Sequence, residues 1–247
     1  MKLNQSNLNS MKENQEIYDD NFVKSLFDRM SKTYGITNYI SSFGFTERWR
    51  KKCVNGINWA DNIKVGYDLM SGMGESWHLI LKESNTKIIG LDISSEMNTK
   101  ARLNLTRHKN WQVEILEQNV LNSDIKSESG DFIISTFGLK TFSIDKQKTL
   151  AKEMSRILRT GGQISLIEIS EPENTLLKIP YMFYLKYIIP TIGRIFMGNP
   201  SDYNMLGVYC QHFKNCHQFK SFLEEEGLNV KVTKHFFGCA TGIVGYK

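Results

Sequence analysis

The feature that most constrains this chain is a strand-like run that ends in a glycine-rich turn, residues 64–75, with the sequence KVGYDLMSGMGE. The apolar run reaches Asp68, and the chain then passes through Gly72 and Gly74 into a helical pattern. Glycine has no Cβ atom, so a ligand can lie directly against the backbone there. The helix start adds free N–H groups and the positive end of a helix dipole. We therefore expect a strand, a tight turn and a helix start that bind a ligand together.

A second strand-like run, residues 87–92, ends in Asp92, about twenty residues after the turn. An acid in this place accepts hydrogen bonds from ribose hydroxyls in dinucleotide-binding folds. The alternative is that Asp92 helps to cap the next helix, beside Ser94 and Ser95. The sequence alone leaves both roles open.

The turn is not that of a nucleoside triphosphate site, because no Gly-Lys-Ser/Thr follows Gly74. It is also not a complete dinucleotide motif, because Trp77 stands where a third small residue would let helix and strand pack closely. A ligand with one ribose, no phosphate and a charged amino-acid end fits better. S-adenosylmethionine has these features, with the backbone of 72–74 for its amino-acid part and Asp92 for its ribose.

The chain after residue 60 alternates between strand-like and helix-like segments, which predicts an α/β fold with a mostly parallel, doubly wound sheet. The expected strands are 64–70, 87–93, 112–117, 131–137 and 163–169. The expected helices are 76–83, 94–107, 144–158 (closed by Thr160-Gly161-Gly162) and 219–227. Two last strands, 230–235 and 238–246, are close enough for an antiparallel hairpin at the sheet edge.

Two segments stand outside this alternation. Residues 17–60 carry apolar residues at helical spacing and predict a helical cap or a lid over a substrate pocket. Residues 176–190 are dense in aromatic and aliphatic side chains, which fits a helix on the core, an apolar wall for a substrate or a membrane-facing patch. The run is too short and interrupted to span a bilayer. Residues 1–16 are polar, without the apolar region of a signal peptide, and we expect a disordered tail.

Composition excludes several classes. The chain has 247 residues, 40% of them hydrophobic, which is enough for one large core. Its net charge of +5 is dispersed, with no basic stripe for nucleic acid. The four cysteines show no disulfide framework, so we expect free thiols in the cytoplasm. The C-x-H-x₃-C-H spacing of residues 210–217 is not a standard zinc pattern, and we expect no metal.

Seven motifs follow one another in a fixed order: FDRMSKTY at 27–34, DLMSGMG at 68–74, DISSEM at 92–97, QNV at 118–120, STFGL at 135–139, ILRTGG at 157–162 and EISEP at 168–172. On these motifs the sequence resembles the UbiE/COQ5-type class I methyltransferases, whose best-known members methylate a carbon of quinols. The resemblance covers nearly the whole chain after the tail. It implies one methyltransferase domain over 17–247, with a helical cap at 17–60 and a substrate-lid insertion at 172–215. It also implies a sheet with seven strands, the last antiparallel.

The resemblance implies S-adenosylmethionine as cofactor and S-adenosylhomocysteine as product. The cofactor contacts that it implies lie on the motif positions, together with the acid that ends the first strand: Asp68, Gly72, Met73, Gly74, Asp92, Ile93, Met97, Asn119, Val120 and Thr136. Tyrosines of the cap and the insertion, with the residues after the fourth strand, give the expected acceptor pocket: Tyr34, Phe137, Lys140, Tyr184, Tyr203 and Tyr209.

The sequence departs from the family on the substrate side. Lys140 stands where the quinol enzymes have arginine, Glu75 where they have aspartate, and Gly35 follows Tyr34 in place of an aspartate. The family arginine and aspartates are thought to orient and deprotonate the quinol. Lysine is not equivalent to arginine at a bidentate site, but it can become a base when desolvated. We infer a different acceptor, or a quinol enzyme with an altered acid–base set.

Lys140 is the preferred candidate for a general base, since it follows the fourth strand at the rim where such sheets bind ligands. The alternative is a solvated loop lysine. Tyr34, Glu75 and His212 are the other candidates. A base of this kind assists methyl transfer to a phenol or to an activated aromatic carbon, beyond the effect of proximity.

Three functions remain as hypotheses. The first is a methyltransferase for an apolar or aromatic small molecule, quinol-like or natural-product-like, methylated at carbon or oxygen. The second is an N-methyltransferase for a phospholipid headgroup at the inner face of a membrane, with peripheral membrane contact. The third is a protein that binds the cofactor and catalyses a step other than methyl transfer, or serves as a partner subunit. A homodimer is a further hypothesis.

Overall fold

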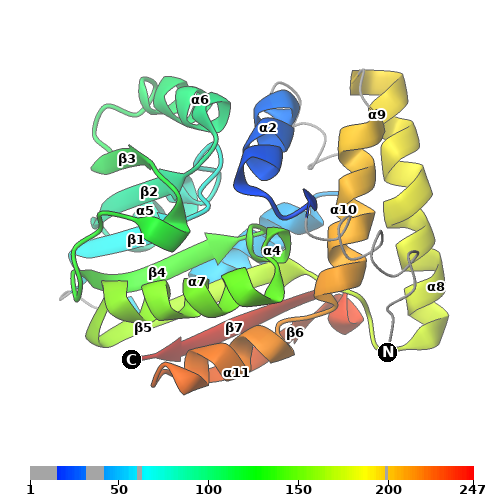
Figure 1. Ribbon diagram of the computed structural model, residues 1–247. Coiled ribbons are helices and arrows are strands. Elements are labelled where there is room, and N and C mark those ends of the chain that lie inside the picture. The colour runs from blue at the N-terminus through cyan, green and yellow to red at the C-terminus, as the bar shows by residue number, and fades with distance from the viewer. Residues whose placement is uncertain (1–15, 32–41, 60–62, 198–199) are drawn as a thin grey trace.

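The computed structural model of the chain describes residues 16–31, 42–59, 63–197 and 200–247. In this part of the chain one seven-stranded sheet has the order β3-β2-β1-β4-β5-β7-β6 (Figure 1). Its strands are β1 Val65–Leu69, β2 Lys87–Asp92, β3 Val113–Glu117, β4 Gly130–Thr136, β5 Leu158–Ile169, β6 Asn229–His235 and β7 Ala240–Tyr246. Strands β1 to β5 pair in parallel, and β7 runs antiparallel to both of its neighbours. The expected α/β fold with an antiparallel last strand is confirmed.

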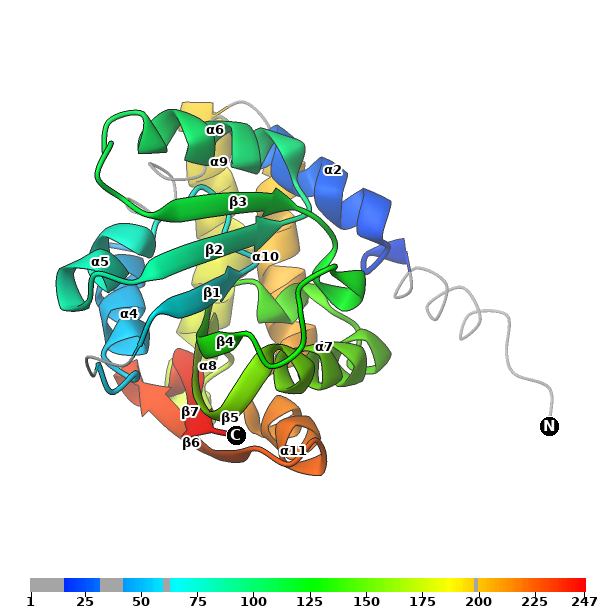
Figure 2. The same ribbon diagram turned by 90° about the vertical axis from the view of Figure 1, so that its left-hand side faces the viewer.

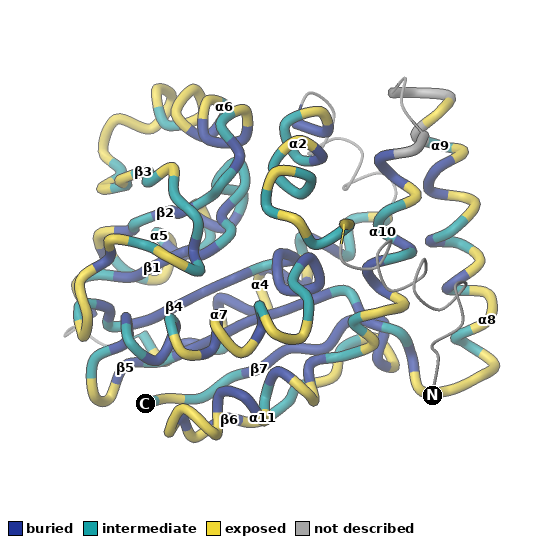
Figure 3. Tube along the Cα trace, viewed as in Figure 1, coloured by how far each residue is buried: buried dark blue, intermediate teal, exposed yellow. Residues whose placement is uncertain are grey.

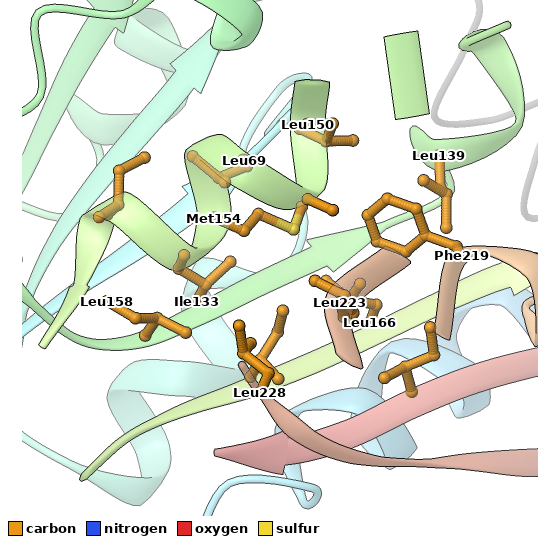
Figure 4. Close-up of a cluster of buried hydrophobic side chains, with 14 of the residues drawn as sticks. Leu69, Ile133, Leu139, Leu150, Met154, Leu158, Leu166, Phe219, Leu223 and Leu228 are labelled. Atoms are coloured by element: carbon orange, nitrogen blue, oxygen red, sulfur yellow. The ribbon is translucent and has the colours of Figure 1, made fainter. Parts of the chain in front are cut away.

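Helices cover both faces of the sheet. The helices of these two layers are α4 Phe45–Val54, α5 Trp77–Glu83, α6 Ser95–Leu105, α7 Ile144–Ile157 and α11 His217–Glu225. Figure 2 shows α4 and α5 on one side of the sheet and α7 and α11 on the other. Along β4 the buried side chains alternate between the faces: Ile133 packs with the α7–α11 layer, and Phe132 and Ile134 pack with the α4–α5 layer. Figure 4 shows the first of these clusters.

A third group of helices stands at the end of the sheet toward which β4 points (Figure 1). It consists of α2 Asp20–Met30, α8 Thr175–Phe183, the π-helical turn η3 Tyr184–Ile188, α9 Ile189–Met197 and α10 Pro200–Phe213. Leu26 of α2, Leu185 of η3 and Tyr209 of α10 share an apolar cluster. Three short 3₁₀ turns complete the described chain: η1 Val120–Asn122, η2 Leu139–Thr141 and η4 Phe236–Gly238. None of the described helices is long and apolar enough to cross a membrane.

One boundary differs from the sequence prediction. The Thr160-Gly161-Gly162 segment, expected to close a helix, lies inside β5, and α7 already ends at Ile157. The register against β4 shifts here, from Gly130 opposite Leu158 to Phe132 opposite Gln163. Gly161 has a φ of +77°, which glycine adopts without a Cβ penalty. The glycine pair therefore lies at an irregularity in a strand. Glycine is typical both of helix C-termini and of β-bulges, so the sequence alone does not distinguish the two.

Candidate active site

The glycine turn lies at the carboxyl end of β1, beside β4, where the strand order reverses. Ligands of open α/β sheets bind at such a point. A cavity opens there, and we call it the turn cavity. Nine residues singled out from the sequence line it: Gly72, Glu75, Asp92, Ile93, Met97, Asn119, Val120, Thr136 and Phe137. The ends of β1, β2 and β4 and the loop after β3 therefore meet at one cavity.

Packing beneath the turn explains its second glycine. Gly74 has a φ of +78°, and a Cβ atom there would lie 2.3 Å from the ring of Trp77. The Trp77 ring is fully buried and also fills the space beside Gly90 of β2. Because Gly74 and Gly90 have no side chains, the Trp77 ring fits under the turn. Met73 and Gly74 shape the turn without lining the cavity; the Met73 N–H donates to Oε2 of Glu75 at 3.2 Å.

Asp92 ties the turn to the next helix. Its Oδ2 accepts from the Gly72 N–H and its Oδ1 from the Ser94 N–H, both at 2.8 Å. The side chain of Ser94 itself caps α6 by accepting from Met97 N–H. Burial raises the pKa of the Asp92 carboxyl to about 6, although the two backbone N–H groups act against this. Asp92 therefore organises the loop and also presents a carboxylate to the cavity.

The turn cavity has an acidic character. Asp20, Glu75 and Asp92 line it, and Arg50 is its single basic side chain among the described residues. Behind the lining, the Asp68 carboxyl is buried on β1 close to the Trp77 side chain. Burial, with a further contribution from the charge of Glu75, raises the pKa of Asp68 to about 8. Such a lining favours a cationic ligand over a phosphate. S-adenosylmethionine, which carries a sulfonium and no phosphate, fits this lining.

Arg50 is a site residue that sequence reasoning missed. It lies on α4 and is 7% exposed, with Nη2 3.4 Å from Oε1 of Glu75 and Nη1 3.6 Å from Oε2 of Glu47. Its guanidinium also lies 5.3 Å from the centre of the Phe137 ring. In sequence Arg50 is one of several cations in an amphipathic helix, and nothing there distinguishes it from Arg48. Only the packing of α4 against the sheet brings it to the turn.

Helix α2 covers the turn cavity. Asp20 accepts a hydrogen bond from Asn119 Nδ2 at 2.7 Å and pairs with Lys146. One turn further on, Lys24 donates to Ser95 Oγ at 2.8 Å, and Asp28 accepts from Ser94 Oγ at 2.6 Å. The helix is therefore joined by polar contacts to the loops after β2 and β3.

A second cavity of about 330 Å³ adjoins the first, and we call it the aromatic cavity. Its walls come from α2, α4, η2, α8, η3, α10 and η4. The aromatic residues that line it are Phe27, Phe43, Phe45, Trp49, Phe137, Tyr181, Tyr184, Tyr203, Tyr209 and Phe236. Phe27, Phe137 and Thr141 line both cavities. Of the acceptor-pocket residues expected from sequence, Phe137, Lys140, Tyr184, Tyr203 and Tyr209 are here, while Tyr34 lies outside the described residues.

Lys140 is neither a solvated loop lysine nor a free amine. Its Nζ lies 2.9 Å from Oε1 of Glu168 and donates to the Phe137 carbonyl at 2.6 Å, and both charged side chains are buried. The Lys140 backbone N–H donates to the other Glu168 oxygen at 3.0 Å. An ammonium held in this pair is a hydrogen-bond donor and cannot accept a proton. The geometry therefore argues against Lys140 as a general base.

The remaining catalytic candidates lie in different places. His212 is exposed on α10, lines neither cavity and has the Tyr18 hydroxyl 3.3 Å from its Nδ1. Glu75 lines the turn cavity, paired with Arg50. Cys210 and Cys216 are buried, whereas His217 faces Glu173 at 3.9 Å. No cluster of three or more potential metal-binding side chains occurs in the part of the chain that the structure describes.

The comparisons with known proteins agree with this geometry. Residues 11–247 match the model of the ubiE/COQ5 methyltransferase family. The chain belongs to this family. A demethylmenaquinone methyltransferase of Bacillus velezensis is 30% identical over 229 residues, 91% of this chain and 97% of the relative. A protein of the same name from Thermotoga maritima is 31% identical over 223 residues, 89% of this chain and 93% of the relative.

Solved structures share the fold. An O-methyltransferase family protein of Burkholderia thailandensis superposes with a TM-score of 0.62 at 12% identity, over 86% of this chain and 58% of that one. A possible histamine N-methyltransferase of Thermotoga maritima gives 0.60 at 18% identity, over 91% of this chain and 99% of that one. This ubiE/COQ5 family member is a methyltransferase that uses S-adenosylmethionine, as the sequence predicted.

Proposed function

We propose that this family member methylates a ring carbon of an apolar quinol, of the class named in the demethylmenaquinone methyltransferases. The observation that carries the proposal is the shared wall of the two cavities at Phe27, Phe137 and Thr141. A ring in the aromatic cavity borders a methyl donor in the turn cavity at these residues. Such an arrangement supplies the proximity and orientation on which methyl transfer mainly depends.

In the turn cavity each chemical part of S-adenosylmethionine has a matching group. Asp92, Asn119 and Val120 line the cavity, and in this proposal Asp92 binds the ribose hydroxyls while Asn119 and Val120 contact the adenine. Arg50 is the basic group for the carboxylate, and Glu75 is a carboxylate for the ammonium and sulfonium charges. When bound, the cofactor supplies an electrophilic methyl group. The Asn119 amide already donates a hydrogen bond to Asp20, so we expect α2 to shift when the adenine binds to Asn119.

Lys140 supports the chemistry from the aromatic cavity. Its buried ammonium is paired with Glu168 and borders the cavity. Methylation at a ring carbon gains from negative charge on a neighbouring hydroxyl oxygen, because this charge activates the ring. A fixed cation stabilises that charge in a site shielded from water. In this proposal Lys140 orients the quinol and stabilises its oxyanion. The hydroxyl proton passes to solvent, and so does the ring proton that the methyl group replaces.

The phospholipid-headgroup alternative is less favoured by the same cavity. Lys140 is the one basic side chain among the described residues that line it, and the carboxylate of Asp202 lines it too. A phosphate is best bound by several cationic donors, and this cavity offers it one. The walls are instead rings and aliphatic side chains, which suit an apolar ring system.

The test compares two acceptors with purified full-length protein and S-adenosylmethionine. Formation of S-adenosylhomocysteine is measured with a reduced, short-tailed demethylmenaquinone analogue and, separately, with phosphatidylethanolamine in mixed micelles. We expect turnover with the quinol, and mass spectrometry should place the methyl on a ring carbon. Turnover with phosphatidylethanolamine alone would replace the proposal with N-methylation.

A further inference from the structure

The helical run α8–η3–α9 is apolar on two opposite sides. Its inner side buries Met182, Leu185 and Ile189 against α2 and α10. Its outer side carries a second apolar row, with exposed fractions of 87% for Leu176, 67% for Ile179, 54% for Phe183 and 59% for Tyr187. The spacing of three, four and four residues places this row on one face. Exposed segments recur along α8 in Figure 3.

The exposed row continues to residues that line the aromatic cavity. Leu176 and the 81% exposed Phe237 line one shallow depression. The Phe237 ring lies 5.7 Å from that of Phe236, and Phe236 lies 4.6 Å from Phe45. Phe45 and Phe236 also line the aromatic cavity. The surface outside and the cavity wall are therefore one continuous apolar surface.

Phe43 is a further exposed ring at this cavity: it is 77% exposed, and its ring lies 6.1 Å from that of Tyr184. Phe43 and Tyr184 both line the aromatic cavity. We call the exposed set the apolar rim: Phe43, Leu176, Ile179, Phe183, Tyr187, Phe236 and Phe237. Seven of the eleven large, exposed apolar side chains in the described chain belong to this rim. Exposed apolar side chains are therefore concentrated here and not scattered over the surface.

Cations without acidic partners accompany the apolar rim. The Arg48 guanidinium lies 5.4 Å from the centre of the Phe45 ring, and Lys52 follows one turn later on α4. Arg194 follows Tyr187 two turns later on α9. All three are exposed, and none has an acid within ion-pair distance in the described chain, whereas Lys234 beside Phe237 is neutralised by Glu173. The apolar rim is therefore bordered by positive charge.

We propose that the apolar rim rests in the surface of an anionic lipid bilayer, so that the aromatic cavity opens toward the membrane. Apolar side chains bordered by Arg and Lys suit the boundary between acyl chains and negative headgroups. A second copy of the chain fits less well, because a two-fold contact would bring the exposed cations that border the rim of both copies together. The inference rests on the proposed function only in that the cavity holds an apolar acceptor, which would enter directly from the bilayer.

The experiment is co-sedimentation of the full chain with vesicles of phosphatidylcholine alone and of phosphatidylcholine mixed equally with phosphatidylglycerol. We expect binding to the anionic vesicles that weakens as salt is raised. The variant L176S/I179S/F237S alters side chains that line neither the turn cavity nor the aromatic cavity, and we expect at least about a tenfold loss of vesicle binding. The matched control, L103S/I144S, removes exposed apolar side chains of α6 and α7 and should bind like wild type.

Equal sedimentation of the rim variant and wild type would overturn the proposal, as would wild-type protein that stays in the supernatant. A wild-type dimer in light scattering that the rim variant abolishes would assign the surface to a second copy instead. Cofactor affinity and turnover of a short-tailed quinol in solution should be equal in both variants. Wild-type protein that binds vesicles but does not methylate the quinol would contradict the proposed function and would still support the membrane-binding surface.

Discussion

The turn cavity and the aromatic cavity share a wall but are built in different ways. In the turn cavity, backbone N–H groups and carboxylates of adjacent loops hold one another, as Asp92 does with Gly72 and Ser94. In the aromatic cavity, side chains from helices far apart in the chain meet around one buried ion pair, Lys140–Glu168. The first arrangement depends on short motifs, and the second depends on how whole helices pack. The motifs of the turn cavity can thus stay constant while the walls of the aromatic cavity change.

The largest expected effect comes from breaking the ion pair in the aromatic cavity. Lys140→Met leaves the Glu168 carboxylate, which is 0% exposed, without its cation. Removing one partner of a buried pair costs about 3–5 kcal/mol, which urea unfolding should show as a loss of stability. The double variant K140M/E168Q removes both charges and should recover much of the loss. Equal stability of the single and double variants would mean that the pair does not hold this wall.

The next effect concerns the turn cavity. Asp92→Ala removes a carboxylate that lines the cavity and leaves the N–H groups of Gly72 and Ser94 without their acceptor. We expect S-adenosylmethionine affinity to fall about 100-fold in calorimetry, since hydrogen bonds to a charged group are worth about 1.5–3 kcal/mol each. Glu117→Ala is the matched control, because Glu117 ends the neighbouring strand β3 and lines neither cavity. A comparable loss in both variants would show that the effect is general and not due to the Asp92 carboxylate.

The two cavities also differ in how much of each the sequence could predict. Gly72, Asp92 and Asn119 follow directly from where strands end, since parallel strands place their carboxyl ends at one edge. The partner of Lys140 had a sequence signal that was not used: Glu168 is an acid inside the otherwise apolar strand ISLIEI. Buried acids are rarely unpaired, so a cation could have been sought beside it.

Arg50 and Phe236 had no comparable signal. Arg50 reaches Glu75 only because α4 packs under the turn, and Phe236 joins the aromatic cavity only because η4 lies beside the start of α4. These are contacts between elements distant in sequence, which local spacing does not encode. The same reason applies to Lys140. Its location after the fourth strand suggested a general base, and only the contact with Glu168 in the folded chain shows that its ammonium is held in an ion pair.

A pH titration should separate the acidic turn cavity from the apolar one. The pKa of Asp92 is raised to about 6, so the carboxyl gains a proton as the pH falls through 6 and becomes a weaker acceptor for the ribose hydroxyls. The contribution of Asp92 to S-adenosylmethionine affinity should therefore be constant above this pH and fall up to about tenfold per pH unit below it. Calorimetry between pH 5 and pH 8 measures this fall, which is about one decade at most over that range. The weaker binding of Asp92→Asn should lack the step at pH 6, and a step that persists there would assign it to another group.

The smallest expected effect is at the border between the cavities. Arg50→Lys keeps the positive charge but loses the planar guanidinium that reaches Glu75 and lies over Phe137. We expect S-adenosylmethionine to bind about three- to tenfold more weakly, because lysine cannot engage a carboxylate in a bidentate way. Arg48→Lys, two residues earlier on the same helix and exposed, is the matched control and should bind the cofactor as wild type does. A rise in the KM for the quinol with unchanged cofactor affinity would instead mean that Arg50 acts on the acceptor in the aromatic cavity and not on the cofactor in the turn cavity.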